Sequence, residues 1–265
     1  MTTIRMGYLG LATIDGTPYF LTGSSMNAVQ SVNTPRLVVG AYVPTGYHWN
    51  KVEVGGNFSG PLHENASDLS ALALDRAEGD HMANSIAVGI AFFGPGSSSG
   101  KHFTGCNVNT LTITATAGDV INFTIDFVGM YPPTDFSSSY EGIACAKLLT
   151  WDRLAIGHDG GDPAQSFTMT INNNLERQYN LDGGGDGYEL YPIDITAGMR
   201  EITGTIVMYA MSGMPDFGPG LTNVSVNVDG VMSFDIPALM HRPEGSAAPS
   251  SAATYALNFT SVCKV

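Results

Sequence analysis

The chain has 265 residues, of which only 13% are charged, and 24 acidic against 11 basic side chains give it a net charge of −13. This length suits one large domain or two smaller ones, and a hydrophobic content of 43% excludes wholesale disorder. The shortage of lysine and arginine argues against a module that grips duplex nucleic acid. The surface must consist largely of Ser, Thr, Asn and Gly, which is typical of extracellular β-proteins and virion proteins.

We expect neither a secretory signal nor a membrane span. The start of the chain lacks an apolar core segment, and the longest apolar run, residues 86–93, is too short to cross a bilayer. The three cysteines, Cys106, Cys145 and Cys263, match no metal spacing and are expected to be reduced structural thiols. These features fit assembly inside a cytoplasm followed by a function outside it.

Only one segment has the pattern of a helix. Apolar residues recur at helical spacing within residues 67–78, Asn65 or Ser67 can cap the start, and Gly79 can end it. Most other apolar residues recur with the period of two that strands require, and we expect about ten strands. The sequence therefore predicts a mainly β fold of the α+β class.

The clearest strands lie in the middle and at the end of the chain. Residues 107–116 and 120–128 flank the turn Gly118–Asp119 and predict a hairpin. Further strands are predicted at residues 166–172, 200–209, 224–229 and 254–262. The apolar side chains expected to share a face within single strands are Phe167, Met169 and Ile171, and then Tyr255, Leu257 and Phe259.

Stretches rich in Pro, Gly and Ser at residues 94–101, 130–140 and 243–251 are expected to form long loops. The middle stretch is the best boundary between two units.

The two predicted units are residues 1–140, which hold the helix, and residues 141–265. Residues 51–60 faintly resemble residues 200–207, and a tandem repeat and chance similarity explain this equally well. One continuous domain therefore remains the alternative.

No arrangement of residues specifies catalysis. His63 and His81 flank the helix beside acids, and a metal or acid–base pair competes there with a simple solvated helix flank. Asp182, Asp186 and Glu189 could bind calcium, but their loop fails the EF-hand pattern and a flexible loop explains it more simply. No nucleophile elbow, phosphate loop or zinc pattern occurs. We therefore expect no enzyme, no cofactor and no metal.

Trp49 lies beside Tyr47 and His48 and could form a platform on which a sugar stacks. A loop tip buried at a subunit contact explains it equally well. The platform supports an alternative function, a β-sandwich carbohydrate-binding or adhesion module displayed on a virion. A β-sandwich hydrolase is a third possibility, but glycosidase chemistry needs two placed carboxylates and the sequence singles out no pair.

Three ordered segments resemble the major tail tube proteins of long-tailed (siphovirus-type) bacteriophages. Residues 105–113 with 118–129 resemble their hairpin, residues 167–176 resemble their strand end NNLE, and residues 192–206 resemble their strand G-x-R-E-V-T-G-S. The motif residues in this sequence are Gly105, Cys106, Asn107, Asn172, Asn173, Asn174, Gly198, Glu201 and Gly204. The match is strong over residues 100–210.

The resemblance implies a β-sandwich or barrel whose inner sheet lines a hollow tube. Six tube units would form each ring, from three chains if the repeat is real and from six otherwise, and rings would stack along the virion tail. The implied partners are the chain itself, tail terminator or neck proteins, tail-tip proteins, and the tape-measure protein and passing DNA, held without specific binding. Assembly would occur in the bacterial host cytoplasm, and the long loops would become ordered only then.

The acidic balance suggests a mechanism for such a tube. A lumen lined by carboxylates repels phosphate and leaves no basic wells in which DNA can lodge during ejection. The candidate lumen-lining acids are Asp119, Asp126, Asp194 and Glu201. Ordinary solvent-facing or interface charges are the alternative for each of them.

Overall fold

The computed structural model describes residues 9–25, 27–33, 48–64, 66, 69–74, 86–94, 97–136, 147–157, 163–179, 190–209, 221–229, 231–240, 244–246 and 254–261. In the first half of the chain its elements are β1 (Leu9–Ile14), β2 (Thr17–Phe20), β3 (Gly23–Ser24), β4 (Asn27–Asn33), β5 (His48–Pro61), α1 (Leu69–Leu74), β6 (Ile86–Gly94), β7 (Ser97–Thr116), β8 (Asn122–Gly129) and β9 (Thr134–Asp135). In the second half they are the 3-10 helix η1 (Trp151–Arg153), β10 (Leu154–Gly157), β11 (Ala164–Asn172), β12 (Leu175–Gln178), β13 (Asp194–Ala197), β14 (Glu201–Tyr209), β15 (Leu221–Val228), β16 (Met232–Met240), β17 (Glu244–Ser246) and β18 (Thr254–Ser261).

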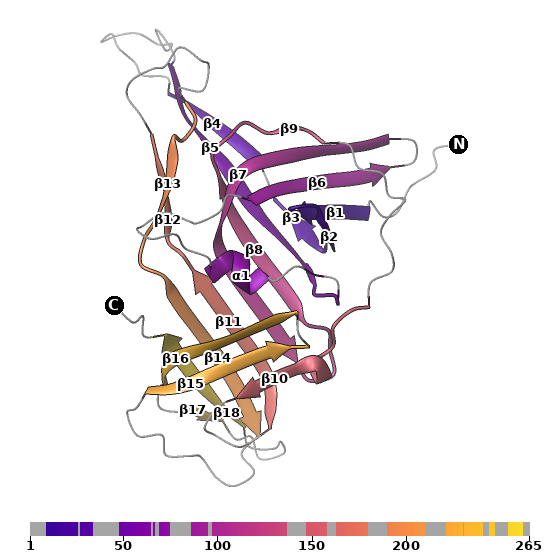
Figure 1. Ribbon diagram of the computed structural model, residues 1–265, viewed down its shortest axis with the longest axis vertical. Helices are drawn as coiled ribbons and strands as arrows, with labels where there is room; N and C mark the ends of the chain where they lie inside the picture. The colour runs from indigo at the N-terminus through magenta and orange to yellow at the C-terminus, as the bar shows by residue number, and fades with distance from the viewer. Residues whose placement is uncertain are drawn as a thin grey trace, which may run out of the picture.

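Six strands lie side by side and antiparallel in the order β5-β8-β7-β11-β14-β18, which we call the large sheet (Figure 1). β4 extends it by pairing with the outer edge of β5. Because successive side chains of a strand point to opposite faces, the apolar residues at alternate positions gather on one face, the core face. The largest side chains buried there include Phe58, Leu111, Phe123, Phe127, Phe167 and Phe259.

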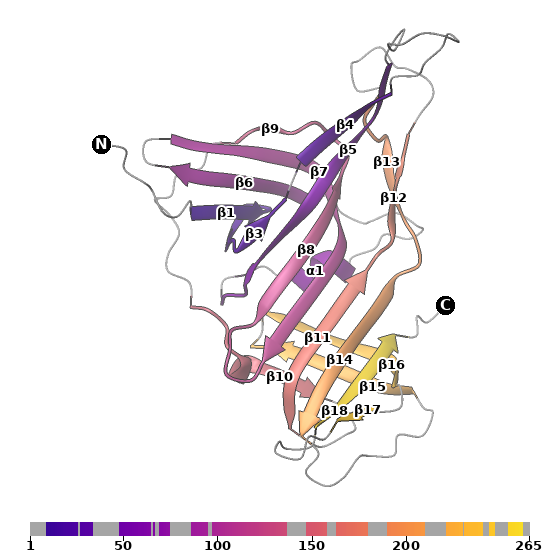
Figure 2. The ribbon, with the colours of Figure 1, turned by 180° about the vertical axis from the view of Figure 1, so that it is seen from behind.

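Two smaller groups of strands cover the core face. The upper group, β6, β1 and β2, continues from the first half of β7, and the lower group, β16, β15 and β10, continues from β18 (Figures 1 and 2). The helix α1 contacts both β7 and β16. In the upper group, Tyr19 meets Phe123 of the large sheet edge-on, with 5.5 Å between ring centroids. One hydrophobic cluster fills the space beneath both groups.

The long strand β7 belongs to both layers because it changes direction. Its residues 97–106 pair with β6, whereas residues 106–114 pair with β8. Gly105 has a φ of +64° at this point, and a Cβ on it would lie 2.7 Å from the ring of Tyr131. A bulge between Val108 and Thr110 then shifts the register. The bulge explains why the alternation of residues 107–116 is imperfect in the sequence.

The predicted mainly β fold with one short α-helix is confirmed. β7 and β8 form the predicted hairpin, and β11, β14, β15 and β18 lie where alternation places strands. The faces predicted for β11 and β18 are the buried ones. α1 falls inside the predicted helix of residues 67–78, while its predicted caps lie outside the described residues.

The predicted loops are wrong in part. Residues 97–101 begin β7 and pair with β6, because backbone pairing with a neighbour overrides a Ser- and Gly-rich composition. Within residues 243–251, β17 pairs with β18, and within residues 130–140, β9 pairs with β7. These parts pair with neighbouring strands of the same chain, and the expectation that the long loops order only on assembly stays a prediction. The eighteen strands of the described residues exceed the expected ten because several have only two to four residues.

The large sheet runs across the boundary predicted near residue 140. β7 of the first predicted unit pairs with β11 of the second, between residues 110–116 and 166–172. The division into residues 1–140 and 141–265 stays a prediction. Among the described helices, none has the length and apolar character needed to cross a membrane.

Candidate functional site

The face of the large sheet that points away from the core, which we call the hydroxyl face, carries a continuous row of hydroxyl groups. The row takes one residue from each strand at one register, namely Ser59, Thr124, Thr112, Thr170, Thr203 and Thr260. Neighbouring strands lie roughly 4.8 Å apart, so the row is about 24 Å long. The hydroxyl oxygens of Thr112 and Thr170 lie 3.0 Å apart.

The next row on this face is also polar and uncharged. It contains Asn122, Thr114, Thr168, Thr205 and Asn258. The Thr205 hydroxyl donates a hydrogen bond of 2.7 Å to the Asn258 side-chain oxygen. Threonine suits these rows for two reasons. Its branched Cβ favours strands, and its hydroxyl can hydrogen-bond at the surface. The surface is therefore polar without being charged.

Charges are few on the hydroxyl face. Its charged side chains within the described part of the six strands are Lys51, Glu53, Asp126 and Glu201. The Lys51 ammonium pairs with the Glu53 carboxylate at 3.0 Å. Asp126, which is close enough to Arg177 to feel its charge, and Glu201 remain against a broad field of hydroxyls and amides, so the face is only weakly negative.

Two of the four acids that we predicted to line a lumen lie on the same face of the large sheet. Asp126 on β8 and Glu201 on β14 both project onto the hydroxyl face, opposite Thr110 and Asn172 respectively. Asp119 lies instead in the turn of the β7–β8 hairpin. Asp194 begins β13, which pairs with β12 in a separate two-stranded sheet.

Asp126 is the most constrained of these acids. Its carboxylate accepts a hydrogen bond of 3.3 Å from the amide of Asn109, the extra residue of the β7 bulge. Partial burial raises the pKa of Asp126, while the Asn109 hydrogen bond and the charge of Arg177 oppose that rise. Keeping the Asp126 carboxylate ionised in the folded chain therefore costs free energy.

Asn173, from the motif NNLE, forms a buried junction at the end of β11. Its side-chain amide donates to the carbonyl of Ala73 at 2.8 Å and to that of Val108 at 2.9 Å. Its oxygen accepts from Arg200 Nε at 2.7 Å, and the side chain has no exposed surface. The Ala73 carbonyl is in the last turn of α1, where carbonyls lack a partner within the helix. One amide thus joins the helix, the bulge of β7 and the start of β14.

The neighbouring motif residues build a tight turn beside this junction. Asn174 has a φ of +49°, and its side-chain amide donates to the Met199 carbonyl at 2.7 Å. The backbone N–H of Gly198 donates to the Asn174 carbonyl at 3.0 Å, and a Cβ on Gly198 would lie 2.9 Å from that oxygen. Asn172 accepts a hydrogen bond from the Asn174 N–H. The turn therefore needs these residue types for its geometry.

The remaining motif residues lie in or against the core. Cys106 and Asn107 are buried, and burial raises the pKa of the Cys106 thiol to about 12, which keeps it protonated and unreactive. Cys106 is free, as predicted, and the other two cysteines lie outside the described residues. Gly204 leaves room for the ring of Phe259 on the next strand. The family-like motif residues thus act mainly in folding.

His63 is not a solvated helix flank, so that interpretation of the sequence is wrong. The chain between β5 and α1 places the ring beneath β2, where Nε2 lies 3.0 Å from the Pro18 carbonyl and the ring centroid lies 5.3 Å from that of Tyr19. Burial lowers the pKa of His63, and the hydrogen bond to Pro18 opposes this shift. His81 lies outside the described residues, within which no cluster of acids, histidines and cysteines is suited to a metal.

Two other candidates fall outside what the structure describes. The calcium candidates Asp182, Asp186 and Glu189 belong to an undescribed segment, and Trp49 lies on β5 with its side chain undescribed. The hydroxyl row was not predicted from the sequence. A signal for it exists, since Thr110 to Thr116 places threonine at every second position, but only the register of six strands shows that the hydroxyls align.

Comparison with known protein families gives one match. The phage tail tube protein family matches residues 46–213, more than half of the chain and all of the strands β5, β7, β8, β11 and β14. No curated protein matches the sequence. Proteins of this family are structural, generally non-enzymatic components of the virion tail that assemble with themselves into the tail tube. The mainly β fold and the matched span agree, and the chain belongs to the phage tail tube protein family.

Proposed function

We propose that this chain polymerises into stacked rings and that its hydroxyl face lines the lumen through which the genome is ejected. The observation that carries the proposal is the hydroxyl row, which crosses six strands at one register. A face that bonded to another subunit would bury apolar side chains at its centre. The rows on this face instead present hydroxyls and amides to the solvent.

Such a wall suits the passage of duplex DNA. Proteins hold DNA chiefly by neutralising phosphates with lysine and arginine, and Lys51, the only basic residue found on this face in the described strands, is paired with Glu53. Asp126 and Glu201 add a weak negative potential that repels phosphate. Repeated around a ring and along a stack, the face becomes a long, weakly negative and hydrated conduit.

Self-assembly of the tail tube family suits closure into a ring. A closed ring of copies leaves fewer sheet edges exposed than a single open sheet does. We propose six tube units per ring, supplied by three chains if each chain holds two units and otherwise by six. In the virion the ends of the tube would meet the neck and tail-tip proteins, with the tape-measure protein inside during assembly in the host cytoplasm.

Introducing positive charge on the hydroxyl face tests this proposal. We expect phage built with Thr124→Lys, Thr168→Lys or Asp126→Lys to form tails of normal appearance by electron microscopy but to eject DNA several-fold more slowly. Ser233→Lys is the matched control, because Ser233 is exposed on β16, outside the large sheet. Unchanged ejection in all three face variants, or equal slowing in the control, would show that another surface lines the lumen. Purified chain that forms no tubes at any concentration would contradict the assembly itself.

A further inference from the structure

Exposed apolar side chains gather at the upper end of the molecule around a groove. The groove has a volume of about 540 Å³ and lies between the segment after β8 and the segment before β13, where it is lined by Tyr131, Pro132, Tyr191, Pro192 and Ile193. Tyr131 is 48% exposed and Ile193 is 57% exposed. Aromatic and proline rings present flat apolar surfaces, which suit another flat ring.

Two aromatic side chains in the lower half of the molecule, Trp151 and Tyr209, are also exposed. Trp151, the first residue of η1, is 48% exposed. Its backbone N–H donates to the Asp119 carbonyl at 3.1 Å, and the Arg153 N–H donates to the Thr150 carbonyl at 2.9 Å. The side chain therefore extends from a short turn tied to the β7–β8 hairpin, which lowers the entropy cost of using it in a contact.

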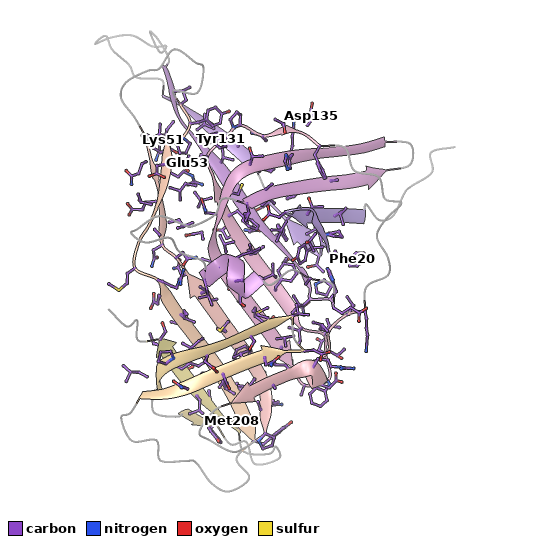
Figure 3. The ribbon with its side chains drawn as sticks, in the orientation of Figure 1. Phe20, Lys51, Glu53, Tyr131, Asp135 and Met208 are labelled. Carbon is purple, nitrogen blue, oxygen red and sulfur yellow. The ribbon has the colours of Figure 1, made fainter. Side chains whose placement is uncertain are left out.

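The groove and Trp151 lie in the upper and the lower half of the molecule, since β10, which directly follows η1, lies in the lower half of Figure 1. Figure 3 places Tyr131 near the top and Met208 near the bottom, and Met208 pairs with Ala164, which borders a hollow next to Trp151. Thr104 borders the upper groove and Thr116 borders the lower hollow. The two are twelve residues apart on β7, a separation of up to about 40 Å along a strand.

We propose that Trp151 of one copy inserts into the Tyr131–Ile193 groove of a copy in the next ring. This inference rests on the proposed function, since it describes how the rings of that tube stack. This contact joins two different surfaces of the chain, so a stack of rings always has free Trp151 side chains at one end and free grooves at the other. Further rings can therefore be added, and the stack stays open. Tryptophan and tyrosine are the residues that most often dominate the energy of such contacts.

Because the contact is small, we expect the groove to be filled by a chain that belongs to a ring and not by a single free chain. One tryptophan buries roughly 150–250 Å², whereas a stable pairwise interface buries about 1,200–2,000 Å². Two isolated chains would therefore not stay together through this contact. When several copies engage at once between two rings, the later contacts are intramolecular, so the two rings bind far more tightly than a single contact would allow.

A disulfide between two different variants tests this contact. Trp151→Cys and Ile193→Cys would be introduced into separate chains, each with Cys145→Ser and Cys263→Ser, and then mixed, assembled and oxidised. We expect a disulfide-linked dimer in tubes of the mixture, and at most a tenth as much in unassembled protein or in tubes of either variant alone. Intact mixed tubes without the linked dimer would overturn the contact while leaving the proposed tube function intact.

The fluorescence of Trp151 gives a second measurement that does not depend on cysteines. In Trp49→Phe, Trp151 is the only tryptophan, since the chain has two. Assembly should shift its emission to shorter wavelength and reduce acrylamide quenching at least threefold, and Ile193→Asp should prevent both changes. Equal quenching in tubes and free chains would overturn the proposal, as would an emission shift produced by an oligosaccharide and not by assembly, which would assign Trp151 to sugar binding.

Discussion

The two faces of the large sheet differ completely although they are built from the same strands. On β8, Phe123 is buried under the upper group of strands, and the next residue, Thr124, projects onto the hydroxyl face. Alternation assigns every second residue to the core and every other residue to the outer surface. One set of residues on each strand therefore serves stability, and the other set is available for the proposed function. Substitutions on the two faces should therefore have separable effects.

Truncating Phe123 should give the largest effect. Its ring is fully buried and meets the rings of Tyr19 and Phe58 at centroid distances of 5.5 and 6.0 Å. Phe123→Ala removes these contacts and leaves a cavity, so we expect a loss of about 4 kcal/mol in the free energy of unfolding. Thr124→Ala, one residue away, should cost less than about 0.5 kcal/mol. Urea denaturation of both variants gives the comparison, and similar losses would show that the two faces contribute equally to stability.

The next largest effect should come from Asn173, a polar residue on the buried side. Asn173→Ala leaves two buried carbonyls and Arg200 Nε without the partner that each has now. Buried groups left unsatisfied cost about 1–3 kcal/mol each, partly offset by water, so we expect a total loss of about 3 kcal/mol. Thermal and urea unfolding would measure it.

Asn172→Ala is the matched control for this junction. Asn172 is half-buried on the other side of the same strand, and its side-chain oxygen accepts a local hydrogen bond from the Asn174 N–H. We expect a loss below about 1 kcal/mol. If the two neighbouring asparagines cost the same, the junction is not a special link between α1, β7 and β14.

Most of the large sheet could be predicted from local pattern. Phe167, Met169 and Ile171 alternate in the sequence and are buried together, because the period of a strand is a local property. The start of β7 could not be predicted, since Ser97 to Lys101 have the composition of a loop and become a strand only by pairing with β6. Whether such a segment pairs depends on a strand elsewhere in the chain, and the composition of the segment itself carries no information about that strand.

The site was predictable to a smaller extent. Asp126 and Glu201 share a face as proposed for a lumen wall, but Asp119 and Asp194 lie elsewhere, because membership of a face depends on register and on which hairpin holds the residue. The motif residue Asn173 was noticed only by resemblance. Its three side-chain hydrogen bonds reach segments up to 100 residues away, which no local pattern encodes.

His63 is a buried polar side chain of the core whose two ring nitrogens differ in their surroundings. Nε2 hydrogen-bonds to the Pro18 carbonyl, whereas Nδ1 is buried and has no partner among the described residues. Because burial lowers the folded-state pKa below 6.5, the unfolded chain binds more protons at mildly acidic pH. The contribution of neutral His63 is present above pH 6.5 and is lost progressively as the pH falls below it, by at most about 1.4 kcal/mol per pH unit.

His63→Gln tests this pH dependence, since glutamine can donate to the Pro18 carbonyl but does not titrate. Urea unfolding at intervals between pH 7.5 and 5 should show the wild-type chain losing more stability than the variant, with the difference growing as the pH falls. Parallel profiles over the whole interval would mean that His63 accepts a proton equally well in the folded and unfolded chains.

The smallest effect on stability is expected for the paired hydroxyls of Thr112 and Thr170. The double variant Thr112→Val, Thr170→Val keeps the branched side chains that favour strands and loses one solvent-accessible contact between oxygens 3.0 Å apart. We expect the free energy of unfolding to change by less than about 1 kcal/mol, as measured in urea. A loss as large as that of Asn173→Ala would show that the hydroxyls are structural. If they are dispensable for folding, stability does not explain their concentration on one face, and the explanation must lie in what that face meets, which under the proposed function is water and the passing duplex.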